Sequence, residues 1–187
     1  SACLVGSEMC IRDSPESSRS IDFYDDDLHG FPHYMLKEIH EIPSVIHRLL
    51  DNYLDCGIRF DPKVLDAISR ASSIHFLACG TSFYASKVGV KYFRALGKPS
   101  SASIGSEWAY DPYDIGGNPF FIILSQSGET ADLIKCQKVI NEHGLPNLVV
   151  TNSKGSTLER KATFSCLLYA GVEVAVASTK SYICLLY

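Results

Sequence analysis

Two short segments of this sequence combine glycine with hydroxyl side chains, a combination suited to holding a phosphate group. They are Cys79-Gly80-Thr81-Ser82 and Ser125-Gln126-Ser127-Gly128-Glu129-Thr130. Each follows an apolar run and precedes a helical pattern, so each offers unpaired backbone N–H groups and the positive end of a helix dipole. Glycine permits a sharp turn and a close backbone approach. The hydroxyl groups that can donate to phosphate oxygens belong to Ser82, Ser125, Ser127 and Thr130.

Neither segment contains lysine or arginine; the nearest are Lys87 and Lys135, inside the helical patterns. A nucleoside-triphosphate loop requires Gly-Lys-Ser/Thr. A dinucleotide fingerprint requires Gly-x-Gly-x-x-Gly, where this chain has Gly-Thr-Ser-Phe-Tyr-Ala. We therefore expect neutral donors and helix dipoles to hold the anion, with no metal and no other cofactor. Several hydrogen bonds to a charged acceptor, at about 1.5–3 kcal/mol each, predict micromolar to millimolar affinity.

Two other interpretations of these segments remain open at this point. Serine and threonine are ordinary N-cap residues, so the hydroxyls could serve only to begin helices. A nucleophilic serine is the other possibility, but Ser127 lacks the Gly-x-Ser-x-Gly elbow and no His–Asp pair can be assigned to it. Glu129 begins a helix, where a carboxylate favours the dipole and has a structural role. No catalytic residue is assigned.

The elements that must position these segments alternate between apolar strands and helices. Strands are expected at 74–80, 101–104, 119–124, 147–151 and 164–169, and helices at 82–96, 131–143 and 156–162. The strands are continuously apolar, as in a parallel sheet covered on both faces. This pattern predicts an α/β fold with a doubly wound parallel sheet. Ligands of such sheets bind beyond the carboxyl ends of the strands, where the strand order reverses.

A helical segment precedes the sheet. Apolar residues recur at helical spacing from Pro32 to Tyr53, and Pro43 is expected to bend or divide this helix. His33, His40 and His47 are seven residues apart, about 10 Å along a helix, which is too far for one metal site. We expect a solvated or interface edge there. A short amphipathic helix is predicted over residues 61–71.

Composition limits the classes of partner and compartment. The chain has 187 residues, a formal net charge of −4 and a pI near 5.8, which argue against nucleic acid or an anionic membrane as the partner. Its seven cysteines form no Cys-x-x-Cys pair, so reduced thiols are expected. No run approaches the ~20 apolar residues of a membrane span, and the start lacks the pattern of a secretion signal. These features predict a cytoplasmic protein.

Both ends of the sequence differ in character from what lies between them. Residues 1–14, SACLVGSEMCIRDS, have no periodicity that connects to the rest, and EMCIRDS resembles a translated sequencing adapter. Residues 184–187 are interpreted in the same way. Residues 15–30, rich in serine and aspartate, are expected to be a linker. Residues 31–71 form the helical lead-in, and 72–183 the α/β domain.

Four segments together resemble one family. CGTS at 79–82, SQSGETAD at 125–132, GVEVAVASTK at 171–180 and FPHYMLKEIHEIP at 31–43 are similar to the isomerase part of the glutamine:fructose-6-phosphate aminotransferases, or glucosamine-6-phosphate synthases. The resemblance covers roughly residues 27–183. It implies a flavodoxin-like sugar isomerase (SIS) fold, of which 72–183 would be the first of two subdomains, truncated. Such enzymes make glucosamine 6-phosphate from fructose 6-phosphate and glutamine.

The resemblance also implies roles for individual residues. Those holding the sugar phosphate would be Ser82, Ser125, Gln126, Ser127 and Thr130. Those contacting the sugar itself would be Thr81, the backbone of Val176, and Ser178. The bound partner would be fructose 6-phosphate or glucosamine 6-phosphate, and the full-length protein would be a homodimer or larger.

The chain also departs from the family pattern. Gly171-Val172-Glu173-Val174-Ala175 stands where Gly-Pro-Glu-Ile-Gly is usual, and Ser106-Glu107-Trp108-Ala109-Tyr110 replaces Ser-Glu-Phe-Arg-Tyr. The family's glutaminase and its catalytic Glu, Lys and His have no counterpart here, so we expect weak sugar-phosphate binding and no catalysis from this chain. Two alternatives are kept: a sugar-phosphate-sensing regulator with the same fold, and another phosphosugar isomerase.

Overall fold

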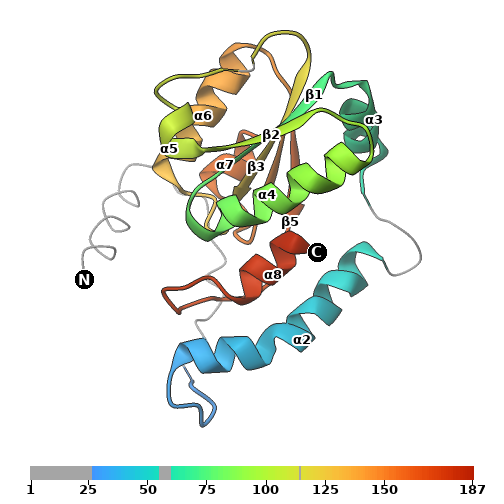
Figure 1. The fold of residues 1–187 in the computed structure, drawn as a ribbon. Coiled ribbons are helices and arrows are strands. Elements are labelled where there is room, and N and C mark those ends of the chain that lie inside the picture. The colour runs from blue at the N-terminus through green and yellow to red at the C-terminus, as the bar shows by residue number, and fades with distance from the viewer. Residues whose placement is uncertain (1–26, 55–59, 114) are drawn as a thin grey trace.

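A parallel sheet forms the centre of the protein (Figure 1). The computed structural model describes residues 27–54, 60–113 and 115–187, and within these ranges five strands pair in the order β2-β1-β3-β4-β5. Their bounds are β1 Ser73–Ala78, β2 Ser100–Ile104, β3 Pro119–Ser125, β4 Asn147–Thr151 and β5 Phe164–Leu167. All four pairings are parallel. The predicted doubly wound sheet is confirmed, and its strand order reverses between β1 and β3.

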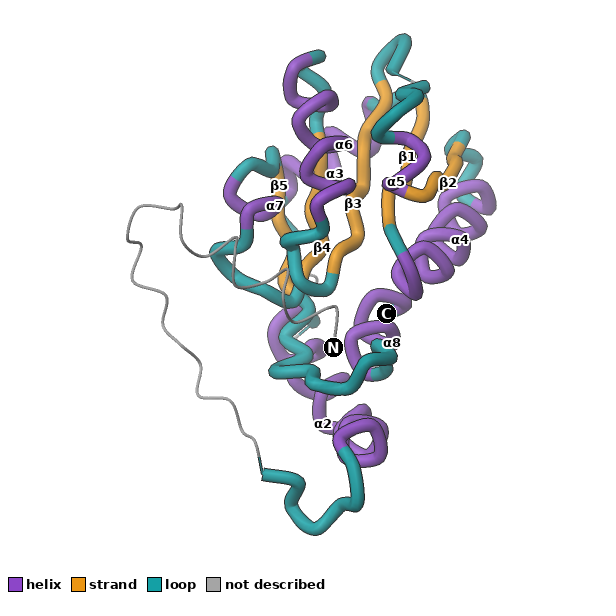
Figure 2. Tube along the Cα trace, turned by 90° about the vertical axis from the view of Figure 1, so that its left-hand side faces the viewer, coloured by secondary structure: helices purple, strands orange, loops and turns teal. Residues whose placement is uncertain are grey.

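Helices cover both faces of the sheet (Figures 1 and 2). Their bounds are α2 Tyr34–Tyr53, α3 Pro62–Arg70, α4 Gly80–Ala95, α5 Gly105–Trp108, α6 Ala131–Glu142, α7 Thr157–Arg160 and α8 Lys180–Leu186. Side chains of α3, α4 and α8 pack on one face, and those of α5, α6 and α7 on the other. In β3, Phe120 and Ile122 join the first core, whereas Phe121 and Ile123 join the second. Burial on both faces explains the unbroken apolar run, since each large side chain removed from water contributes about 1.5–3 kcal/mol.

The helices that flank the candidate site end as their glycines predict. Gly97 follows α4 with φ +75°, and Gly144 follows α6 with φ +66°. Such left-handed residues after a helix allow the last carbonyls to find partners, and Lys98 N and Gly97 N donate to the carbonyls of Phe93 and Arg94. α4 begins at Gly80, two residues before the predicted start, and the sequence patterns did not predict α5 or α8.

Pro43 does not divide the first helix, which is one of the two effects expected of it. α2 runs unbroken from Tyr34 to Tyr53 with Pro43 inside it. A proline removes one helical hydrogen bond and costs about 3 kcal/mol in a helix interior. Packing outweighs this cost, because the following turns bury Val45 and Leu49 in a cluster that also includes residues of α8 and of the segment after β5.

The histidines of the lead-in lie at a solvated edge, as expected. His40 and His47 are exposed, and the His40 ring stacks on Phe31. His33 is the N-cap of α2, where its Nδ1 accepts from Leu36 N at 3.2 Å. In the described part of the chain, no three His, Cys, Asp or Glu side chains are grouped as a metal site would need. Nor does that part contain a helix of the length and apolarity that crossing a bilayer requires.

The two ends with predicted foreign character differ in what the structure describes. Residues 1–14, and residues 15–26 of the predicted linker, lie outside the described ranges. Residues 184–186 form the last turn of α8, where Cys184 is buried and Leu185 and Leu186 contact the core.

The end of α2 is fastened to β5 by the phenol of Tyr53. Its hydroxyl donates to Leu167 O and accepts from Leu167 N, both at 2.8 Å, and also accepts from the Cys166 thiol at 3.2 Å. Burial raises the pKa of Tyr53 far above its ordinary value of 10.0. The folded protein therefore keeps the phenolic proton at a pH where the unfolded chain has lost it, so stability falls as the pH rises above about 10.

We expect Tyr53→Phe to lower the free energy of unfolding by about 1–3 kcal/mol at pH 7, because it leaves backbone groups of Leu167 without partners. Its alkaline loss of stability should also be shallower than that of the wild type. Chemical denaturation between pH 7 and 11 measures both effects. Tyr92→Phe, at an exposed position on α4, is the matched control. Equal stabilities for wild type and Tyr53→Phe would refute this role.

Candidate functional site

The two hydroxyl-rich segments lie at adjacent strand ends, as the sequence predicted. β1 and β3 are neighbours, with Ala78 paired to Leu124, and each segment begins at or just after these residues. One leads into α4 and the other into α6, which cover opposite faces of the sheet. The N-termini of α4 and α6 therefore flank the point where the strand order reverses, the usual position of ligands in such sheets.

The turn after β3 is organised by its own hydroxyls. Ser125 Oγ accepts from Gly128 N at 3.1 Å and is hydrogen-bonded to Thr130 Oγ1, also at 3.1 Å. Ser127 Oγ accepts from Glu129 N at 3.2 Å. Ser125 is buried, whereas Gln126, Ser127 and Thr130 are half-buried. The hydroxyls thus lie on one tight turn and keep access to solvent at its outer side.

These hydroxyls do not serve as helix caps, which weakens the capping interpretation. Thr130 is the N-cap of α6 and Cys79 the N-cap of α4, and neither side chain makes a capping hydrogen bond. The first-turn N–H groups of a helix require an acceptor from elsewhere when the cap residue supplies none. An anion at the mouth of both helices would meet that requirement and the helix dipoles together.

The side chains of Ser156 and Thr151 leave no room for a Cβ at Gly128. Its φ is +65°, and a Cβ at this position would lie 2.1 Å from Ser156 Oγ and 2.9 Å from Thr151 Oγ1. Its carbonyl accepts from Leu158 N at 3.1 Å. The next residue, Glu129, accepts from Thr157 N at 2.9 Å. Glu129 therefore has the structural role that the sequence predicted, but it caps α7 and not α6.

The segment after β1 presents one buried and one exposed hydroxyl. Thr81 is exposed and Ser82 is 9% exposed, and Gly80 before them has φ +55°. Cys79 is half-buried, and burial raises the pKa of its thiol. A thiol with a raised pKa stays protonated at neutral pH and is a poor nucleophile.

The lysines that lie nearest in the sequence to the two segments, Lys135 and Lys87, have other partners. Lys135 Nζ lies 3.4 Å from Asp132 Oδ1 and 5.2 Å from the centre of the Tyr110 ring. Lys87 Nζ lies 5.3 Å from the centre of the Phe83 ring.

The segment that carries Val176 and Ser178 lies between β5 and α8, at the same edge of the sheet (Figure 2). Asn152 connects it to the turn after β3. Its backbone N donates to Gln126 O at 3.0 Å, while its side chain accepts from Ala170 N at 2.9 Å and donates to Gly171 O at 2.7 Å. No local sequence pattern distinguishes Asn152 as a residue of the site.

Val176 and Ser178 are not joined directly to the phosphate segments. The Val176 side chain is fully exposed, and Ser178 Oγ donates to Glu173 Oε2 at 3.2 Å. The structure therefore joins Ser125 and Thr130 by a hydrogen bond, with Ser127 on the same turn, and places Thr81 and Ser82 at the neighbouring strand end. It holds the last two predicted residues on a separate segment.

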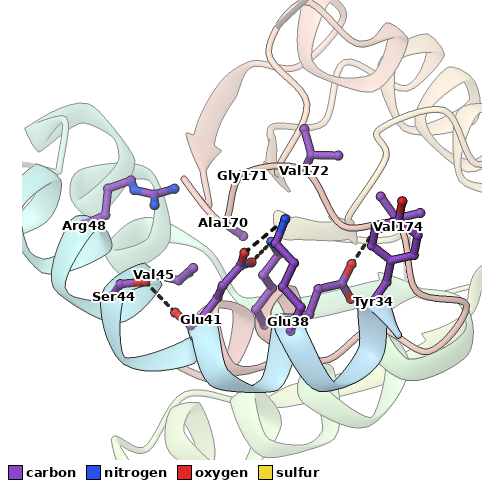
Figure 3. Close-up of a pocket in the computed structure, with 12 residues that line it drawn as sticks. Tyr34, Glu38, Glu41, Ser44, Val45, Arg48, Ala170, Gly171, Val172 and Val174 are labelled. Atoms are coloured by element: carbon purple, nitrogen blue, oxygen red, sulfur yellow. Dashed lines mark hydrogen bonds and ion pairs between the residues drawn. The ribbon is translucent and has the colours of Figure 1, made fainter. Parts of the chain in front are cut away.

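Two hollows lie elsewhere on the protein. One, of about 220 Å³, opens between α2 and the segment after β5 and contains charged side chains (Figure 3). The other is an apolar groove of about 460 Å³ lined by α2, α3, α4 and α8. None of the predicted binding residues lines either hollow. The candidate phosphate site is therefore defined by its donors and by its place at the switch point.

Fold and site together define a doubly wound α/β domain with its candidate ligand site between β1 and β3. The chain belongs to the SIS domain family, whose model matches residues 67–186. Among curated relatives, it is 41% identical over 174 residues to the glutamine–fructose-6-phosphate aminotransferase (isomerizing) of Streptococcus pneumoniae strain R6, an alignment that covers 91% of this chain. It is 44% identical over 155 residues, 81% of the chain, to the protein of the same name from Lactococcus lactis.

Comparison with a solved structure leads to the same family. The C-terminal domain of glucosamine-fructose-6-phosphate aminotransferase from Francisella tularensis superposes with a TM-score of 0.79 and 28% identity, over 86% of this chain and 47% of that one. The chain spans 29% of the length of the Streptococcus relative and 26% of the Lactococcus one. The similarity to the isomerase part of this family, inferred from the motifs, is confirmed.

Proposed function

We propose that this chain is the first SIS subdomain of a glutamine-dependent fructose-6-phosphate aminotransferase, in which it holds the phosphate group of the sugar. The observation that carries the proposal is the hydrogen-bond network that joins the Ser125 and Thr130 hydroxyls and the Gly128 N–H. It lies beside two helix starts that lack side-chain caps. The names of the relatives at 41–44% identity support an aminotransferase over the two alternatives, a regulator or another phosphosugar isomerase.

In this proposal the donors fall into two groups. Those for the phosphate oxygens are Ser82, Ser125, Gln126, Ser127 and Thr130, and those for the sugar are Thr81, the backbone of Val176, and Ser178. Hydroxyl and amide donors around a dianionic ester form charge-assisted hydrogen bonds. Helix N-termini add about 0.3–1 kcal/mol each when exposed, and up to about 2 when partly buried. The expected dissociation constant lies between about 1 µM and 1 mM.

The complete reaction would form glucosamine 6-phosphate from fructose 6-phosphate and glutamine. It needs opening of the sugar ring, addition of ammonia at C2 and proton transfer from C2 to C1, and the transfer requires a positioned acid–base group. Glu129 is committed to the N–H of Thr157, and Cys79 keeps its proton. In this proposal the chain positions the substrate, and neither Glu129 nor Cys79 supplies the acid–base group.

Calorimetric titration of the 187-residue chain tests the proposal. Glucosamine 6-phosphate is expected to bind in the micromolar to millimolar range, whereas glucosamine without the phosphate is expected to show no binding at the same concentrations. The chain should form no glucosamine 6-phosphate from fructose 6-phosphate and ammonia. Equal binding of both sugars would contradict the phosphate site. Appreciable product would show that the chain itself carries an acid–base group.

We also propose a cytosolic protein that is a dimer or larger in its complete form. The described cysteines Cys79, Cys136, Cys166 and Cys184 are free thiols, which suits a reducing compartment.

A further inference from the structure

Two carboxylates outside the predicted binding set hold the segment between β5 and α8. Glu38, on α2, accepts with Oε1 from Val174 N at 2.6 Å and from Ala175 N at 3.0 Å. Glu173 accepts with Oε1 from Thr179 N at 2.8 Å and from Ser181 N at 3.3 Å. Its other oxygen accepts from the Ser178 hydroxyl. The backbone is thus held on both sides of Val176.

Glu38 is buried where it contacts the backbone of Val174 and Ala175. Its side chain is 2% exposed and points from α2 towards Val174 (Figure 3). Burying a carboxylate is costly unless hydrogen bonds compensate for the lost water, and the two backbone N–H groups supply charge-assisted bonds. The neighbouring Lys180 is also buried, and it is paired with Glu41 at 2.6 Å. Because Glu41 pairs with Lys180, the carboxylate of Glu38 can accept hydrogen bonds from the backbone of the segment.

These contacts fix the orientation of the peptide groups. In a trans peptide the carbonyl points opposite to the N–H of the following residue. Because Val174 N and Ala175 N point at Glu38, the carbonyls of Glu173 and Val174 point away from α2. The start of the segment is fixed in turn to Gln126 of the phosphate turn through Asn152. Asn152 thus joins the segment to the turn, while Glu38 joins it to α2 and Glu173 joins it to the start of α8.

We propose that Glu38 and Glu173 are positioning residues that set the affinity of the site for the sugar and not for the phosphate. They do so by holding the backbone on both sides of Val176 in place. This inference rests on the proposed function. It gives α2 a part in recognition, although Glu38 lies outside residues 67–186, which match the SIS model.

The test compares two probes, glucosamine 6-phosphate and inorganic phosphate, on the 187-residue chain and its variants. Glu38→Ala and Glu173→Ala are each expected to weaken glucosamine 6-phosphate binding about tenfold or more, because each removes the hydrogen bonds that hold the sugar-contacting segment in place. Binding of inorganic phosphate should change less than about twofold, because the segment does not touch it. Glu38→Gln and Glu173→Gln keep an acceptor oxygen and should recover most of the affinity.

Glu142→Ala, at an exposed position on α6, is the control and should change neither affinity. Circular dichroism confirms that each variant is folded, and Glu173→Gln retains the test if Glu38→Ala unfolds. Equal weakening of both probes, or no weakening of either, would overturn the positioning role while leaving the phosphate site intact. If the wild-type chain binds neither probe, the proposed function fails and this inference fails with it.

Discussion

Gly128→Ala is expected to lower the free energy of unfolding by about 2–5 kcal/mol and to abolish measurable sugar-phosphate binding. A left-handed conformation costs an alanine about 1–2 kcal/mol, and the residue has φ +65°. Its new methyl group would also lie 2.1 Å from Ser156 Oγ and 2.5 Å from Ser156 Cβ. Overpacking of this kind costs about 1–3 kcal/mol more. Movement of the turn to relieve the clash would withdraw Gly128 N from Ser125.

Gly144→Ala separates the two causes. Gly144 has nearly the same φ, +66°, but nothing lies within 4 Å of a Cβ placed there. This variant should lose only the conformational part, about 1–2 kcal/mol, and should bind glucosamine 6-phosphate like the wild type. Urea denaturation and calorimetry measure the two properties. Equal destabilisation by both substitutions would show that Ser156 does not constrain the turn.

Ser125→Ala is expected to weaken glucosamine 6-phosphate binding about 10- to 100-fold. The hydroxyl is the centre of the turn, since it bonds both Gly128 N and Thr130 Oγ1. Its removal takes away one donor to a charged acceptor, worth about 1.5–3 kcal/mol, and leaves the other donors less well ordered. The loss of folding stability should be smaller, about 0.5–1.5 kcal/mol.

Calorimetry with Ser69→Ala as the control checks this expectation. The Ser69 hydroxyl also bonds to backbone, Asp66 O at 2.8 Å, but it lies on α3, away from the switch point. This control should bind glucosamine 6-phosphate with wild-type affinity. A Ser125→Ala protein that is folded and binds as tightly as the wild type would remove the serine from the site.

The main features of the sheet could be predicted from the sequence because they depend on local patterns. The apolar run at Pro119–Ser125 must be covered on both faces, and Gly97 and Gly144 follow the helices that they end. The place of the two hydroxyl-rich segments followed from the rule that ligands of such sheets bind beyond the carboxyl ends of the strands, where the strand order reverses. These predictions needed no knowledge of which distant residues meet.

Other features depended on contacts between distant parts of the chain, which a local pattern does not encode. Glu38 reaches Val174 across 136 residues, and Tyr53 reaches Leu167 across 114. α2 continues through Pro43 because the later turns are anchored by packing. α5 has only four residues, too few for helical periodicity to appear.

The central claim is that uncharged groups at the ends of β1 and β3 hold a phosphate ester. A crystal structure of the chain with glucosamine 6-phosphate tests it most directly. We predict the phosphate within about 2.7–3.2 Å of the Ser125, Ser127 and Thr130 hydroxyls and of the N–H groups that begin α4 and α6. A phosphate bound instead beside Lys37 and Lys180, in the charged hollow of Figure 3, would contradict the account.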